Sequence, residues 1–156
     1  MRAVPSKVAI LVPISPDAIW PRTPLFSKLL EDVRGPKVDV WVFTLPWGIV
    51  AEGVPIQHPE LFPAAYDHED LAATRESAVR TRAWLLAHGS SYLRIVVLGT
   101  GETMTYSNRL RGSVWSRAME KLKFPTYVVK VPRKGGLGSP LVQARLTRAV
   151  NEPLNL

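Results

Sequence analysis

Four short apolar runs alternate along the chain with segments of helical periodicity, and this alternation limits the fold more than any other feature. The apolar runs are residues 7–12, 38–43, 94–98 and 126–131. Residues 7–12 form a nearly unbroken apolar stretch, which is typical of a strand buried on both faces, and residues 94–98 predict another buried strand. Residues 38–43 are rich in β-branched and aromatic residues and, like residues 126–131, predict a strand. We therefore expect an α/β domain built on a mostly parallel sheet.

The helical segments begin at residues that favour helix starts. The expected helices begin near Thr23–Pro24, Asp67, Thr105–Asn108 and Ser139–Pro140. The third of them carries Leu110, Val114, Ala118 and Leu122 on one stripe, and Pro125 ends it. Right-handed crossovers then favour four strands in the order 2-1-3-4, numbered along the chain, with helices on both faces of a three-layer domain.

Length and composition fit one domain, residues 1–156, large enough to bury a core. The chain has no cysteine, which excludes disulfides, thiol catalysis and thiolate metal sites. Its three histidines show no metal-ligand spacing, so we expect no metal and no cofactor. No apolar run reaches transmembrane length, and the first residues lack the apolar region of a signal peptide, so we expect a cytoplasmic protein without a membrane partner. The 14 prolines fit a thermophile.

The charge of the chain is uneven and indicates a polyanionic partner. Residues 1–90 have a net charge of −1, whereas residues 91–156 have a net charge of +8. This asymmetry favours nucleic acid, although a basic solvated surface would also explain it. The expected RNA-binding residues are Arg109, Arg111, Arg117, Arg133, Lys134, Arg145 and Arg148.

A pocket is expected at the carboxyl ends of the strands, where open α/β sheets bind ligands. The residues there have backbone amides or aromatic rings that could contact an anion or a base, although glycine is also an ordinary requirement of strand-to-helix turns. The expected pocket residues are Pro13, Trp20, Trp47, Gly48, Gly99 and Gly101.

Three further side chains are the candidates for catalysis if the protein is an enzyme. They are Tyr66, Asp67 and Glu102. Each also has a simpler explanation: Asp67 is a natural N-cap, Tyr66 could fill the edge of the core, and Glu102 could be a surface acid.

Two segments between the second and third apolar runs carry a family resemblance. Residues 46–50, Pro-Trp-Gly-Ile-Val, and residues 62–67, Phe-Pro-Ala-Ala-Tyr-Asp, resemble segments of the α/β domain of archaeosine synthase and its relatives. The resemblance covers residues 7 to about 125. It implies a fold like that of uracil-DNA glycosylases and a link to archaeal tRNA.

The loop after the first apolar run departs from the pattern of this family. Ile14 stands in place of a cysteine, Ala18–Ile19 in place of Lys-Pro, and Phe26 in place of a histidine. The resemblance implies that this loop joins an amino acid to a nitrile-bearing deazaguanine, and these changes remove the nucleophile and most proton carriers. The fold would then be kept and the reaction lost.

Three functions remain open from the sequence. The favoured one is a non-catalytic RNA-binding protein associated with tRNA or the ribosome, with RNA (tRNA or rRNA) and a possible ribosomal or protein partner. The others are a tRNA base-modification enzyme with a rearranged pocket and a small-molecule or nucleotide-binding protein. Function has to be argued from the site, because one fold serves many activities.

Overall fold

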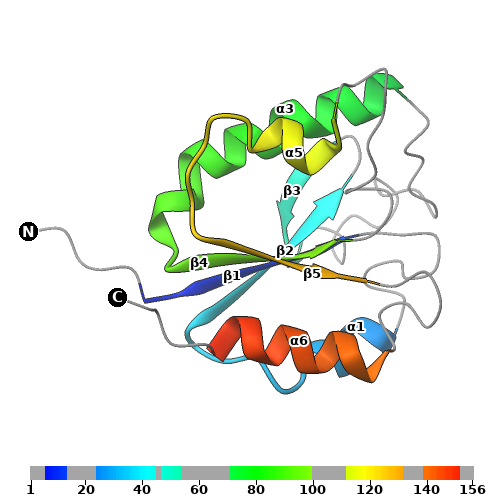
Figure 1. The fold of residues 1–156 in the computed structure, drawn as a ribbon, viewed down its shortest axis with the longest axis vertical. Coiled ribbons are helices and arrows are strands. Elements are labelled where there is room, and N and C mark those ends of the chain that lie inside the picture. Colours follow the sequence, from blue (N-terminus) through cyan, green and yellow to red (C-terminus); the bar gives the residue numbers. More distant parts are fainter. Residues whose placement is uncertain are drawn as a thin grey trace, which may run out of the picture.

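A five-stranded mixed sheet runs through the middle of the structure (Figure 1). The computed structural model describes residues 6–13, 24–44, 47–53, 71–99, 112–131 and 139–151. The strands are β1 (Val8–Pro13), β2 (Val38–Thr44), β3 (Gly48–Ala51), β4 (Arg94–Gly99) and β5 (Thr126–Lys130). The helices are α1 (Pro24–Leu30), α3 (Leu71–His88), the 3-10 turn η2 (Gly89–Ser91), α5 (Val114–Ala118) and α6 (Pro140–Asn151). The α/β class expected from the sequence is confirmed.

The order of the strands is β3-β2-β1-β4-β5. β1 pairs in parallel with both β2 and β4, and β4 pairs in parallel with β5. The expectation of four strands is corrected to five, because β3 adds an antiparallel strand beside β2. This strand is only four residues long and lies in a region that has no helical or alternating pattern. It forms because the chain turns back immediately after β2.

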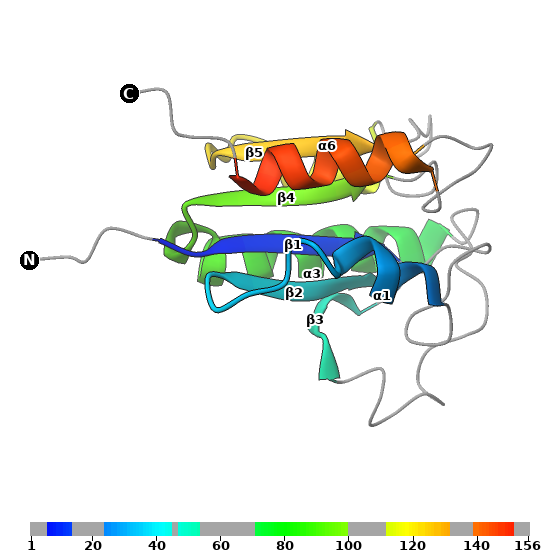
Figure 2. The ribbon, with the colours of Figure 1, turned by 90° about the horizontal axis from the view of Figure 1, so that it is seen from below.

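Helices cover both faces of the sheet and enclose two separate cores. α3 and α5 lie on one face, and α1 and α6 lie on the other (Figures 1 and 2). Alternate side chains of β1 pack into different cores: Ile10 packs on the α1–α6 face, and Leu11 packs on the α3–α5 face. None of the helices in the described segments is long and apolar enough to cross a membrane.

The helix expected between residues 105–108 and 122 is shorter in the structure. α5 has five residues, and a capping box formed by Ser113 and Ser116 begins it. A turn follows in which Lys121 has a φ of 61°, so the helix cannot continue to Leu122. Val114 and Ala118 are buried as the stripe predicted.

The long helix α3 has an unusual distribution of side chains. Hydroxyl side chains face the sheet, because Thr74, Ser77 and Thr81 are all buried. Two apolar side chains of α3, Val79 and Leu86, are exposed, whereas Trp84 and Leu85 are buried in the core. Ser77 hydrogen-bonds to the sheet through the Thr44 carbonyl oxygen, whereas the buried hydroxyl of Thr81 has no hydrogen-bond partner among the described residues.

Candidate nucleic-acid interface

The carboxyl ends of the parallel strands lie at one edge of the sheet, as expected for the predicted pocket. Pro13 ends β1 and Gly99 ends the neighbouring β4. The pocket residues Trp20 and Gly101 lie outside the described residues. The three candidate catalytic residues, Tyr66, Asp67 and Glu102, also lie outside them.

Hydroxyl groups hold the β2–β3 hairpin against α3 at this edge. Thr44 Oγ1 donates a hydrogen bond of 2.8 Å to the carbonyl oxygen of Gly48, and Ser77 Oγ donates one of 2.7 Å to the carbonyl oxygen of Thr44. Thr44 and Ser77 are both buried. Because a buried hydroxyl or carbonyl without a partner costs stability, these bonds fix the hairpin to one position on the helix.

Gly48 allows the close approach of this hairpin. Its φ is 74°, in the left-handed region that favours glycine. A Cβ atom on Gly48 would lie 2.8 Å from Arg80 Cβ and 3.0 Å from the backbone nitrogen of Thr81. The neighbouring Trp47 is half-buried and packs against the core on the α1–α6 face, as predicted for an ordered turn. The Trp-Gly pair therefore serves the packing of the hairpin.

A hollow lies between the edge strand β5 and α6. Its volume is about 390 Å³, within the range of ligand pockets. α6 packs on the sheet through Val142, Leu146 and Ala149. Lys130, Arg145 and Arg148 line the hollow, and no acidic side chain is among its lining residues in the described part of the chain. We call this hollow the β5–α6 groove.

Tyr127 supplies an aromatic surface in the β5–α6 groove. It is 40% exposed because β5 is the last strand of the sheet. The guanidinium carbon of Arg94 lies over its ring, 5.5 Å from the ring centre. Arg94 itself is 2% exposed and donates a hydrogen bond of 2.9 Å from Nη1 to the carbonyl oxygen of Ala149, near the end of α6. Arg94, on β4, thus connects Tyr127 on β5 with the end of α6 at the base of the groove.

The structure brings together some of the predicted RNA-binding residues and separates others. Arg145 and Arg148 are three residues apart on α6 and therefore share one side of that helix. Arg117 lies on α5, on the other face of the sheet, where it forms an ion pair of 3.2 Å with Glu120. The remaining four, Arg109, Arg111, Arg133 and Lys134, lie outside the described residues.

Two groove residues, Tyr127 and Lys130, are missing from the sequence prediction, although a signal for them exists. The expected strand order already places residues 126–131 at the end of the sheet. An edge strand leaves part of its side chains in solvent, so both residues could be predicted as exposed. The strand expected at residues 126–131 is present as β5.

A hydrogen-bonded network at the amino ends of the strands has a structural role. The Tyr92 hydroxyl donates to Asp39 Oδ2 and accepts a hydrogen bond from Trp41 Nε1, both at 2.9 Å. The pKa of Tyr92 is raised to about 12, mainly by burial; the Trp41 hydrogen bond lowers the pKa, and the hydrogen bond and charge of the Asp39 carboxylate raise it. A tyrosine that holds its proton this firmly acts as a fixed hydrogen-bond donor.

The described residues contain no group of three or more His, Asp or Glu side chains that could hold a metal ion. Comparisons of the chain with protein-family models, curated proteins and solved structures found no match. The resemblance to archaeosine synthase therefore stays a prediction. The chemistry of the β5–α6 groove is the remaining guide to function.

Proposed function

We propose that this protein binds RNA through the β5–α6 groove and catalyses no reaction on it. The observation that carries the proposal is that Lys130, Arg145 and Arg148 are among the residues lining one hollow that also holds an exposed aromatic ring. The ring belongs to Tyr127, and the cations come from two elements that are adjacent only in the folded protein.

The arrangement of charge fits a phosphate backbone. Lys130, Arg145 and Arg148 bring three positive charges to the lining of one groove. A polyanion is attracted to such a group of charges, and its binding releases the counterions condensed on it. Arginine adds geometric fit, because a guanidinium can pair with a phosphate through two parallel hydrogen bonds.

The class of RNA and the lack of catalysis are supported by the resemblance to archaeosine synthase. It favours tRNA or ribosomal RNA in the cytoplasm of an archaeon. The replacement of the family's cysteine by Ile14 removes the nucleophile of its reaction. An amino-acid transfer assay on deazaguanine-containing tRNA should accordingly give no turnover above a protein-free control, and turnover would refute the non-catalytic part of the proposal.

Charge reversal in the groove tests RNA binding directly. The triple variant Lys130→Glu/Arg145→Glu/Arg148→Glu should bind fluorescein-labelled single-stranded RNA at least tenfold more weakly in an anisotropy titration. Each lost phosphate contact should also reduce the log–log salt slope by about 0.7. The variant should stay folded, because all three side chains are exposed.

A matched control carries the same change of charge on the opposite face. Arg75→Glu/Arg80→Glu/Lys121→Glu alters three exposed cations of α3 and the turn after α5. This control should keep most of the affinity and its salt slope. If it weakens binding as much as the groove variant, or if affinity hardly changes with salt, the groove is not the binding site.

A further inference from the structure

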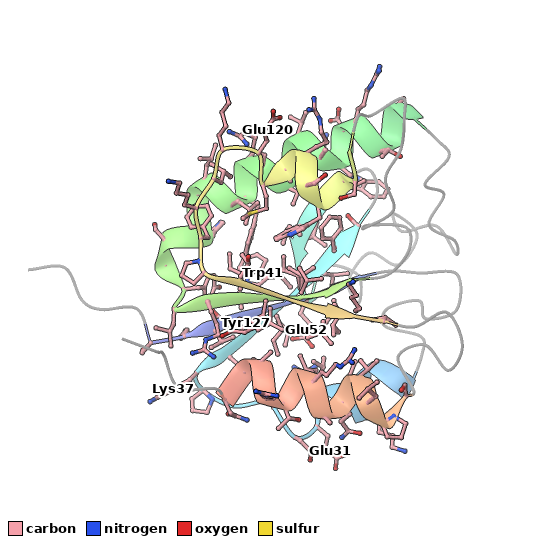
Figure 3. All side chains as sticks on the ribbon, in the orientation of Figure 1. Glu31, Lys37, Trp41, Glu52, Glu120 and Tyr127 are labelled. Carbon is pink, nitrogen blue, oxygen red and sulfur yellow. The ribbon has the colours of Figure 1, made fainter. Side chains whose placement is uncertain are left out.

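The Tyr127 ring contacts a guanidinium on one face, and a large part of the residue is exposed to solvent. The Arg94 guanidinium lies over one face, and 40% of the residue is exposed. Figure 3 shows Tyr127 beside the sheet, above α6. A ring held in this way offers a flat surface to a ligand without packing against a second ring.

Arg94 holds this ring in place. It is almost fully buried, and its side chain is tied to the end of α6 through the Ala149 carbonyl oxygen. Carbonyl groups near the C-terminus of a helix carry partial negative charge, so they stabilise the buried guanidinium. The cation in turn attracts the π-electrons of Tyr127. Tyr127 therefore loses little conformational freedom when a ligand binds, which favours affinity.

We propose that an unpaired RNA base stacks on the open face of Tyr127, so that the groove selects single-stranded RNA over duplex. This inference rests on the proposed function and adds the class of RNA to it. Lys130, Arg145 and Arg148 line the same groove as the ring and receive the phosphates on either side of the stacked base. The bases of a duplex are already stacked on each other, so a duplex cannot use the ring.

The size of the effect follows from the stacking energy. Stacking of one base on an aromatic side chain is worth about 1–3 kcal/mol, which is roughly a 5- to 150-fold change in affinity. Tyr127→Leu keeps an apolar side chain but removes the ring, so it should weaken the binding of oligouridine by this factor. Tyr127→Phe keeps the ring and should bind within about twofold of the wild type.

Two further probes separate stacking from charge. A duplex RNA and an abasic ribose-phosphate strand of the same length should bind the wild type and Tyr127→Leu equally, since neither has a free base. A single strand containing 2-aminopurine should lose fluorescence when saturated with wild type or Tyr127→Phe, and should lose much less with Tyr127→Leu.

Each outcome decides between the two proposals. If Tyr127→Leu binds oligouridine as tightly as the wild type while the groove charge reversal abolishes binding, the proposed function stands and stacking on Tyr127 is wrong. Equal affinity of the wild type for single strand and duplex would also overturn the inference. If the wild type binds no RNA at all, both proposals fail.

Discussion

Replacing Gly48 with alanine should destabilise the fold strongly through the backbone of the hairpin. The residue has a φ of 74°, and a non-glycine residue in such a region costs about 1–3 kcal/mol. The new Cβ would also lie 2.8 Å from Arg80 Cβ and 3.0 Å from the backbone nitrogen of Thr81. Overpacking of this kind costs a further 1–3 kcal/mol, so we expect a loss of about 2–6 kcal/mol.

Urea denaturation followed by tryptophan fluorescence measures this loss. With a slope near 2 kcal/mol per M, the midpoint should fall by roughly 1–3 M. Gly35→Ala is the matched control, because no atom lies within 4 Å of the position that its methyl group would take and its φ is outside the left-handed region. That variant should be neutral or more stable by up to about 1 kcal/mol, since alanine restricts the unfolded chain.

A second variant checks the cause. Adding Arg80→Ala to Gly48→Ala should recover none of the loss, because the contact is made by Arg80 Cβ, which alanine keeps. If Gly48→Ala unfolds at the same urea concentration as Gly35→Ala, or if Arg80→Ala restores stability, the argument from the hairpin contact is refuted.

Three other outcomes follow from the structure. Leu146→Ala, at a fully buried position of α6, should lower the free energy of unfolding by about 2–5 kcal/mol in urea denaturation. Leu141→Ala, at a position of the same helix that is 53% exposed, should lower it far less. Equal losses in the two variants would contradict the packing of α6. Ser113→Ala removes the N-cap of α5 and should lower stability by about 1 kcal/mol, with no loss in Ser113→Asn. The raised pKa of Tyr92, about 12, means that the native state keeps a proton that the unfolded state loses above pH 10. Stability should therefore fall between pH 10 and 12, and Tyr92→Phe should reduce this fall; an unchanged pH profile would show that Tyr92 is not its source.

The central parallel strands β1 and β4 could be predicted because both of their faces are buried. Such strands read as continuous apolar runs, and β1 shows this most clearly: residues 8–12 are all buried. β3 could not be predicted in this way. Its existence depends on the close contact of Gly48 with α3, and that contact joins parts of the chain far apart in sequence.

The limits of helices were harder to predict than their buried positions. The stripe through Val114 and Ala118 identified the buried side of α5, but periodicity does not mark where a helix stops. α5 ends at Ala118, and the left-handed backbone of Lys121, for which lysine carries no sequence signal, prevents a continuation to Leu122. The same limit applies to the groove. Arg145 and Arg148 were identified from α6 alone, whereas the contribution of Tyr127 depends on which strand lies at the edge.

The attachment of the β2–β3 hairpin to α3 should leave a recognisable trace in distant relatives. The hydroxyl of Thr44 and the backbone of Gly48 are four residues apart within one hairpin, so their spacing cannot change without breaking the bond between them. Ser77 and Arg80 are joined by helical geometry and must likewise stay three residues apart. Relatives that keep this attachment should therefore show two short patterns together: Ser or Thr followed four residues later by Gly, and a hydroxyl on the first turns of the next long helix.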